Sequence, residues 1–307
     1  MIICSFNVRG LGSRVKRRKI QEVVREEMVD FLAFQETKLE DIPESIVSNI
    51  WGNCDYGWSF LPATGNSGGI LSIWNKVKAS LVFTFTGDGF VGVCLDLLLE
   101  NRRCYIVNVY ASCHIRDKRR LWNDICMSKR GFGDGLWCVV GDFNSVRNVT
   151  ERKGVHSLSQ DSRTLEMREF DDFLESLELV DLPLVGRKYT WFHPNGISMS
   201  RLDRVLISSS WFGCWGDPMV RVLERDVADH CSLVLRYSSD DWGPKLFRFK
   251  NCWLQSNDFK EVVRLAWDAC LAEGWMGFVL KEKLKSIKGA IRAWRSLGRW
   301  EGRKILL

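Results

Sequence analysis

The sequence predicts an α/β domain built on a mixed β-sheet, followed by a helical segment. Over the first 239 residues, short apolar runs typical of β-strands alternate with stretches of helical periodicity. Several of the β-like runs follow one another with no helix between them, which indicates hairpins and therefore antiparallel pairs beside any parallel ones. Beyond about residue 240 the β-like runs stop and two helical patterns take their place. The 307 residues suffice for one large domain and an appendage.

Two apolar runs near the N-terminus predict buried strands, because β-branched and aromatic residues fill them. They are MIICSFNV and VDFLAFQET, and residues 16–28 between them have helical periodicity. Further strands are predicted at GGILSIW, SLVFTFT, FVGVCLDLLL, CYIVNVY and LWCVVGDFNSV. Helices are predicted at DKRRLWNDICMS and RTLEMREFDDFLESL. The domain is expected to end with the strands KYTWF, RLDRVLI, PMVRVL and CSLVLRY.

A domain boundary is predicted at the polar, turn-rich stretch SSDDWGPK. It separates a domain of residues 1–237 from a basic helical linker segment of residues 238–307. Residues 240–307 carry fourteen Lys and Arg against eight Asp and Glu, whereas the rest of the chain holds thirty of each. The second helical pattern has an apolar stripe formed by Leu280, Leu284, Ile287, Ile291 and Trp294. Two interpretations of this segment stay open: the stripe packs on a neighbour, or the basic face binds nucleic acid.

Membrane and secreted proteins are not expected from this composition. No apolar run approaches the roughly 18 residues of a membrane span, and the N-terminus lacks the basic start of a signal peptide. The eleven cysteines include no C-x-x-C pair, which is typical of reduced core thiols rather than of disulfides or zinc. The sequence therefore predicts a nuclear or cytoplasmic protein.

Polar residues recur at the ends of the apolar β-runs. In LWCVVGDFNSV an apolar run ends by presenting Asp142 and Asn144, either as a plain turn or as a catalytic pair. In layered α/β folds such strand ends converge on one edge, where ligands bind. The residues in these positions are Asn7, Glu36, Tyr110, Asp142, Asn144, Asp203, Asp229 and His230.

The residue types at these strand ends narrow the chemistry. Carboxylates are hard oxygen ligands that suit Mg²⁺, and a His oriented by Asp203 can act as a general acid or base, or as a charged phosphate clamp. Motifs of P-loop enzymes, esterases and zinc proteases are missing from the sequence. Magnesium-assisted phosphodiester cleavage fits this set of groups best.

Six short motifs, in order, give the sequence a family resemblance. FNVRG, QETK, NVYA, GDFN, SRLDRVL and ADH resemble the motifs of the endonuclease/exonuclease/phosphatase superfamily over residues 1–237. The closer likeness is to the apurinic-type endonuclease domain of plant LINE (non-LTR) retrotransposons. This resemblance implies a four-layer α/β sandwich of two packed mixed β-sheets flanked by helices (DNase I-like), with a C-terminal helical extension. The tail looks like the segment that joins this endonuclease to a reverse transcriptase, whose domain is absent here, as in a truncated element.

The resemblance also implies roles for individual residues in nicking one strand of double-stranded DNA. The cofactor would be Mg²⁺, for which Mn²⁺ can substitute, and it would be held by Glu36 and Asn7. Asp229 would assist, either as a further carboxylate of the metal site or as one that supports it from behind. Asp142 would orient or deprotonate the attacking water. Asn144 and Tyr110 would hold the phosphate, and His230, oriented by Asp203, would stabilise the charge of the transition state.

The sequence differs from the usual family motifs at two positions. Arg9 stands where housekeeping apurinic endonucleases often have an acid, and Ala228 replaces the usual Ser before Asp-His, which we expect to weaken activity.

Residues 190–201 contain the pair Asn-Gly, a hairpin signal, and in LINE endonucleases a hairpin here helps to read the DNA groove. The expected DNA contacts are Arg9, Thr190, Asn195 and Arg201. The run RVKRRK at 14–19 is either a solvated helix start or a phosphate-contact or nuclear-localisation patch.

Two alternative functions remain open. Another phosphoesterase of the same fold, such as an inositol-phosphate phosphatase, a sphingomyelinase or a deadenylase, would share the metal and histidine groups. A catalytically decayed retrotransposon remnant is the non-enzymatic alternative: the complete set of acids, amides and His argues against it, and Ala228 and the truncation argue for it.

Overall fold

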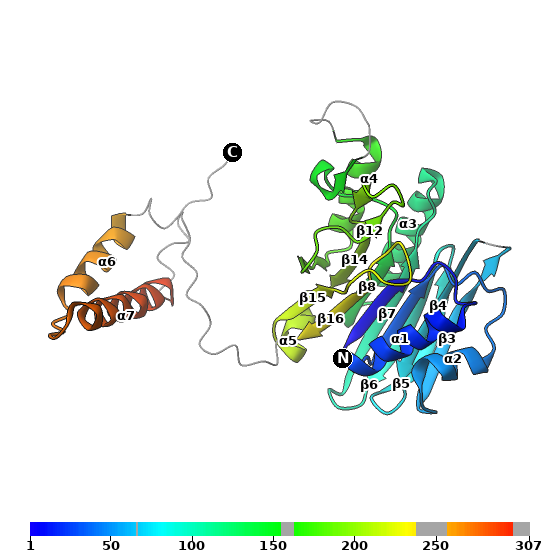
Figure 1. Ribbon diagram of the computed structural model, residues 1–307, viewed down its shortest axis with the longest axis horizontal. Helices are drawn as coiled ribbons and strands as arrows, with labels where there is room; N and C mark the ends of the chain where they lie inside the picture. Colours follow the sequence, from blue (N-terminus) through cyan, green and yellow to red (C-terminus); the bar gives the residue numbers. More distant parts are fainter. Residues whose placement is uncertain (66, 155–162, 238–256, 297–307) are drawn as a thin grey trace. The chain divides into compact units, whose positions relative to one another are not determined.

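A computed structural model of the chain describes residues 1–65, 67–154, 163–237 and 257–296 (Figure 1). The chain divides into two compact units, Met1–Ser239 and Asp240–Leu307. The stretch SSDDWGPK, where the boundary is predicted, lies outside the described residues. Every helix within these residues is too short or too polar for a membrane span.

The first unit contains two large mixed sheets. The seven-stranded sheet has the order β11 (Leu184–Val185), β15 (Pro218–Val222), β16 (Leu233–Tyr237), β1 (Ile3–Asn7), β2 (Phe31–Gln35), β4 (Ser67–Asn75) and β3 (Tyr56–Thr64). The six-stranded sheet has the order β10 (Val180–Asp181), β14 (Asp203–Ile207), β8 (Leu136–Asp142), β7 (Arg102–Tyr110), β6 (Phe90–Leu97) and β5 (Ala79–Gly87). The β1–β2 and β7–β8 pairs are parallel and their other neighbours antiparallel, which confirms the mixed sheet.

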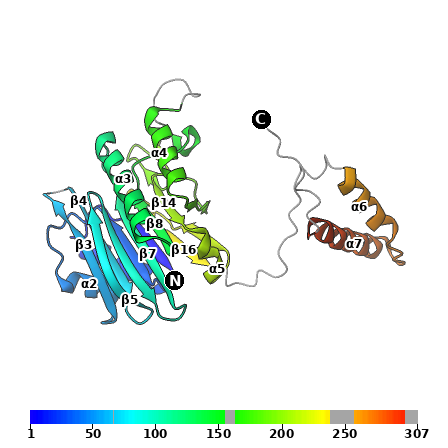
Figure 2. The same ribbon diagram turned by 180° about the vertical axis from the view of Figure 1, so that it is seen from behind.

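Helices cover the outer faces of both sheets. The helices of the described residues are α1 (Arg14–Glu26), α2 (Glu44–Trp51), α3 (Ile115–Phe132), α4 (Leu165–Ser176), α5 (Phe212–Trp215), α6 (Asn257–Asp268) and α7 (Met276–Ser296). In Figure 1, α1 and α2 lie over the sheet that contains β1 to β4. Seen from behind in Figure 2, α3 and α4 lie over the sheet that contains β7 and β8. The four-layer sandwich is therefore confirmed.

The alternation of side chains along each strand produces three apolar layers. Ile3 and Phe31 point into the core between the two sheets, whereas Cys4 and Leu32, one residue later, pack under α1 and α2. A third cluster joins the outer face of the six-stranded sheet to α3 and α4. Because both faces are buried, the central strands appear in the sequence as continuous apolar runs.

Several elements were not predicted. The edge strand β3 mixes polar residues with Pro62, which a strand tolerates only at its edge, and α2 is too short for a clear period. A small third sheet joins β12 (Trp191–Phe192), β13 (Met199–Ser200) and β9 (Arg152–Lys153), so that KYTWF forms a strand over two residues only. Two 3₁₀ turns, η1 (Val149–Glu151) and η2 (Ser209–Trp211), complete the unit.

In the second unit, the described residues 257–296 form a pair of helices. α6 and α7 pack on each other through Phe259, Ile291 and Trp294. The C-terminal half of the predicted apolar stripe thus meets a neighbour within the same unit, whereas Leu280 and Leu284 remain about half exposed.

Candidate active site

The polar strand ends converge on one edge of the sandwich because of how the strands pair. β1 and β2 are parallel, and so are β7 and β8, so each pair ends at the same edge. In register, Tyr110 lies opposite Asp142, and Asp142 lies opposite Asp203, the first residue of the antiparallel strand β14. β16 runs antiparallel to β1, which brings the residues just before it, Asp229 and His230, to this edge as well.

The glycine in GDFN allows β8 to reach this edge. Gly141 has a φ of +142°, and a Cβ at this position would lie 2.0 Å from the backbone oxygen of Val109 on β7. Only glycine fits such a close approach of two backbones. Asp142 follows at once, 1% exposed, and its Oδ1 accepts a hydrogen bond of 2.9 Å from the backbone N–H of Asn144. The pair is thus a turn that also fixes a buried carboxylate.

Asp142, His230 and Asp203 form a buried carboxylate–imidazole–carboxylate cluster. Nδ1 of His230 lies 2.9 Å from Oδ2 of Asp203, and its Nε2 lies 3.7 Å from Oδ2 of Asp142. These three side chains could also hold a metal ion, since their ligand atoms lie within 4.8 Å of one another. A metal requires a neutral imidazole, whereas two flanking carboxylates favour the protonated ring. We therefore interpret the cluster as a proton-bearing relay.

The protonation of these groups follows from their burial and their charges. Burial raises the pKa of Asp142 to about 6, with the cationic His230 opposing the shift and Asp203 adding to it. Burial alone would lower the pKa of His230, but Asp203 and Asp142 outweigh it and raise the pKa to about 9. Burial, with Glu36 and Asp142 nearby, also raises the pKa of Tyr110, so that its hydroxyl remains a hydrogen-bond donor.

Asn7 and Glu36 place two oxygen atoms beside this cluster. Nδ2 of Asn7 donates to Oδ2 of Asp142 at 2.9 Å, which fixes the amide so that its Oδ1 is the free acceptor. Oδ1 accepts only one bond, from the backbone N–H of Arg9 at 3.2 Å, among the described residues. The Glu36 backbone is left-handed, with a φ of +56°, and its carboxylate lies 3.4 Å from Nζ of Lys38. A carboxylate and a carboxamide oxygen are a donor set that suits Mg²⁺ or Mn²⁺.

Asn144 is held in a strained conformation by its neighbours. Its φ is +48°, its Nδ2 donates to the backbone oxygen of Ala111 at 2.8 Å, and its own carbonyl accepts from the buried Nζ of Lys118 at 2.6 Å. Lys118 is in turn paired with Glu166 of α4 at 2.6 Å. The strain persists because these contacts over-determine it, as is common at functional sites.

An open cavity of about 590 Å³ joins these groups. Eight of the twelve predicted site residues line it, namely Asn7, Arg9, Glu36, Tyr110, Asp142, Asn144, Asp229 and His230. Asp203 lies behind His230, and Asn195 is exposed at the tip of the hairpin 192–199. Ala228 is half-buried and packs against the core under α1 and α2.

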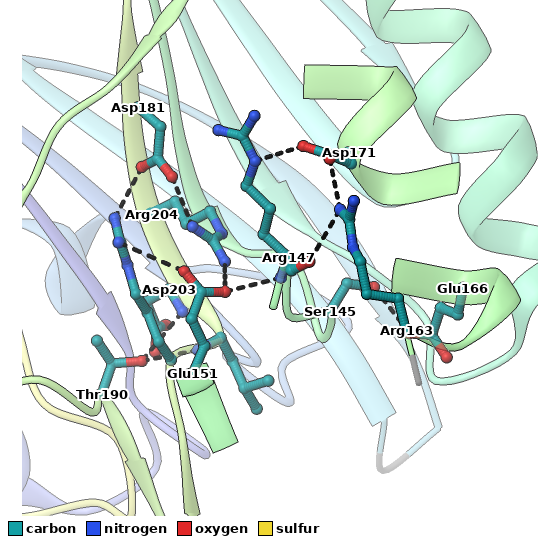
Figure 3. Close-up of polar contacts among 12 residues, drawn as sticks. Ser145, Arg147, Glu151, Arg163, Glu166, Asp171, Asp181, Thr190, Asp203 and Arg204 are labelled. Carbon is teal, nitrogen blue, oxygen red and sulfur yellow. Dashed lines mark hydrogen bonds and ion pairs between the residues drawn. The ribbon is translucent and has the colours of Figure 1, made fainter. Parts of the chain in front are cut away.

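Thr190 and Arg201 lie elsewhere, which corrects their expected role as DNA contacts. Thr190 is fully buried, and its hydroxyl accepts from the backbone N–H groups of Leu202 and Asp203, at 3.0 Å each. The Arg201 guanidinium is committed to an ion-pair cluster with Glu151, Asp181 and Arg204, part of which is drawn in Figure 3. The Thr190 hydroxyl is buried, and both terminal nitrogens of Arg201 are engaged by carboxylates, while its Nε is buried.

Other residues of the site were missed. Trp191 and Arg152, from the third sheet, line the cavity, and the Trp191 Nε1–H donates to Asp229 at 3.2 Å. Gln35 and Asn108 do not line the cavity; both are fully buried and join β2 to β7 through a bond of 2.6 Å. Gln35 and Asn108 could have been noticed in the sequence, because each is a polar residue inside an apolar run. Nothing in the sequence around Arg152 indicates that it lines the cavity.

Comparison with known proteins agrees with this geometry. Residues 4–240 match the Endonuclease/Exonuclease/phosphatase family. The chain belongs to this family. As a member, it is placed among phosphoester-hydrolysing enzymes. No curated protein sequence matches the chain.

Solved structures share the fold at low sequence identity. The AP endonuclease LMAP from Leishmania major is 16% identical, with a TM-score of 0.57 over 76% of this chain and 86% of that one. The endonuclease domain of TRAS1, a telomere-specific non-LTR retrotransposon, is 12% identical, with a TM-score of 0.57 over 77% of this chain and 97% of that one. An AP endonuclease from Archaeoglobus fulgidus is 18% identical, with a TM-score of 0.58 over 77% and 99%.

Proposed function

We propose that this family member is a magnesium-dependent endonuclease that nicks one strand of double-stranded DNA, of the type found in plant LINE retrotransposons. The observation that carries the proposal is the shared cavity of the Asp142–His230–Asp203 cluster and the oxygen donors of Asn7 and Glu36. The six sequence motifs and the fold shared with the TRAS1 endonuclease domain support the retrotransposon type. A nuclear or cytoplasmic location accompanies such a substrate.

The catalytic steps follow from the positions of three groups. Asp142, ionised above pH about 6, accepts a proton from a water molecule as its oxygen forms a bond to the phosphorus. The bond from phosphorus to the leaving sugar oxygen breaks, and that oxygen leaves with the electron pair and takes up a proton from solvent. The imidazolium of His230, held by Asp203, stabilises the negative charge on the phosphate oxygens, and Tyr110 donates a hydrogen bond to the same phosphate.

A divalent cation would be held by Glu36 and Asn7. Their oxygens lie in the cavity and carry few competing hydrogen bonds among the described residues. When bound, the ion supplies Lewis-acid stabilisation of the phosphate. Asn144 fixes the geometry of Asp142 through its backbone N–H. Arg9, half-exposed in the cavity, and Asn195, at the hairpin tip, are the proposed contacts to DNA.

Nicking of supercoiled plasmid by the purified full chain tests the proposal. We expect conversion to open circles with Mg²⁺ and none with EDTA. Parallel assays on single-stranded DNA, RNA, an inositol phosphate and sphingomyelin separate the other phosphoesterases of this fold. Failure to nick with Mg²⁺ or Mn²⁺ would contradict the proposal, and preferential hydrolysis of a lipid or inositol phosphate would replace it.

A further inference from the structure

Arg9 stands at a fixed point of the cavity. Its backbone is left-handed, with a φ of +48°, and its N–H donates to Asn7. Nζ of Lys16 donates to the carbonyls of Val8 and Arg9, at 2.7 and 3.2 Å, and so ties this loop to the first turn of α1. The next residue is also held, since the N–H of Gly10 donates to the Glu36 carbonyl at 2.7 Å. These bonds fix the backbone of Arg9, from which the side chain reaches the cavity and Asp229.

The partner of Arg9 is Asp229. The guanidinium Nη1 makes an ion pair with Oδ2 of Asp229, which also accepts from Trp191 Nε1. The Asp229 side chain is 13% exposed, and no other Lys, Arg or His of the described residues forms an ion pair with it. Its Oδ1 is buried and has no hydrogen-bond donor within the described part of the chain. A carboxylate this far from water needs a cation beside it.

The cavity contains two acids that do not belong to the histidine relay, Glu36 and Asp229. Each is a hard oxygen donor of the kind that binds a divalent cation. Among the described residues, Glu36 forms an ion pair with Lys38 alone, at 3.4 Å, whereas Asp229 is already paired with a guanidinium, which keeps its charge at any accessible pH. A divalent cation would have to displace Arg9 to bind Oδ2 of Asp229, and Arg9 would repel a cation that approached the buried Oδ1.

We propose that the Arg9 guanidinium takes the place of a second divalent cation beside Asp229. The protein therefore binds a single divalent ion, at Glu36 and Asn7, instead of two. Asp229 is then a positioning residue for Arg9 and not a metal ligand. One of the five N–H donors of the guanidinium is used by Asp229, and the others remain for a phosphate oxygen. This inference rests on the proposed function only in requiring a divalent ion at Glu36.

The test counts bound Mn²⁺ on the full chain by electron paramagnetic resonance and calorimetry, without any nuclease assay. We expect one ion for the wild type and none for Glu36→Gln. Arg9→Ala should bind a second ion, because Asp229 is released, and Arg9→Ala combined with Asp229→Asn should return to one. Arg9→Lys, which keeps the charge, and Arg152→Ala, which removes another arginine of the same cavity, should each bind one.

The outcomes separate this inference from the proposed function. The role of Arg9 would be overturned by two ions on the wild type. It would also be overturned by a single ion on Arg9→Ala, provided that a thermal unfolding curve shows this variant to be folded. If Arg9→Ala does not fold, two ions on the wild type would still overturn the role of Arg9. One ion with no nicking of DNA would overturn the proposed function alone, and no ion at all would overturn both.

Discussion

Two buried charge clusters lie on opposite faces of β14, and they differ in how their charges balance. Asp203 begins the strand and belongs to the relay with His230 and Asp142, whereas Arg204, the next residue, points to the ion-pair cluster. That cluster combines two guanidiniums with two carboxylates: Arg201, Arg204, Glu151 and Asp181. In the relay, two carboxylates share one imidazole.

The difference appears in the pKa values of the acids. Burial would raise the pKa of Glu151, but Arg204 and its neighbours hold it below its ordinary value. For Asp142, burial is the larger influence, and the pKa rises to about 6 in spite of His230. A balanced cluster keeps its charges fixed and serves as structure. An unbalanced one has a proton that can move near neutral pH, which is what catalysis requires.

The largest effect is expected from a substitution in the relay, and it should be on the rate of DNA nicking. Asp142→Asn removes the proton acceptor while preserving shape, and we expect nicking to fall by about 10² to 10⁴-fold. The free energy of unfolding at pH 7 should stay the same or rise, because burial disfavours the carboxylate. Plasmid nicking measures the rate, and urea unfolding measures the free energy of unfolding. Full activity in Asp142→Asn would remove Asp142 from the mechanism.

The corresponding effect in the ion-pair cluster should be on stability. Arg204 is fully buried, so Arg204→Met leaves Glu151 and Asp181 with less compensation, and we expect a loss of about 3–5 kcal/mol in the free energy of unfolding. The matched control is Arg103→Ala, which breaks an exposed pair with Asp96 and should cost under about 1 kcal/mol. Equal losses in the two variants would show that Arg204 has no special structural role.

The two clusters should respond to pH in opposite directions. The pKa of His230 rises from 6.5 to about 9 on folding, so its contribution is fully present below pH 6.5 and is lost as pH rises through 9. For this buried ring the contribution is about 3 kcal/mol. Urea unfolding in EDTA should therefore show wild type and His230→Gln converging between pH 6.5 and 9. A constant difference would contradict the shift.

Glu151 provides the opposite case. Its pKa is lowered on folding, so its contribution is present above its ordinary pKa of 4.5 and is lost as pH falls through the folded value. Wild type and Glu151→Gln should thus converge in acid, with a difference that stays constant between pH 6.5 and 9. Convergence in alkali would mean that the balanced cluster also carries a mobile proton.

The smallest effect should come from the hairpin tip, which touches neither cluster. The ion-pair cluster anchors its base, since the N–H of Arg201 donates to the Glu151 carbonyl and β13 pairs with β9. Replacing residues 194–197 by an unrelated turn should leave unfolding and the cleavage of a small phosphodiester unchanged. The distribution of nick sites on plasmid DNA should change, by primer-extension mapping, and an unchanged distribution would count against DNA contact by Asn195.

Thr190 and Arg201 show where reasoning from sequence failed. Both flank a hairpin signal and both are polar, so the sequence alone favoured exposure at the DNA surface. Their burial depends on partners distant in sequence: Glu151 lies 50 residues before Arg201, and Thr190 binds backbone groups of Leu202 and Asp203. Local pattern does not encode which face of a short irregular segment meets the core.

The sequence by itself determined an α/β domain on a mixed β-sheet, because apolar runs bounded by turns predict strands that are buried on both faces. It also determined which strand ends carry acids, amides and histidine. The second sheet followed only from the family resemblance. Only the tertiary structure decided that Asp203 and Arg204 serve two different clusters, and that Arg9 meets Asp229 across the cavity. Ion pairs such as Arg9–Asp229 join residues 220 positions apart. No local propensity specifies them, and the register of the strands brings them together.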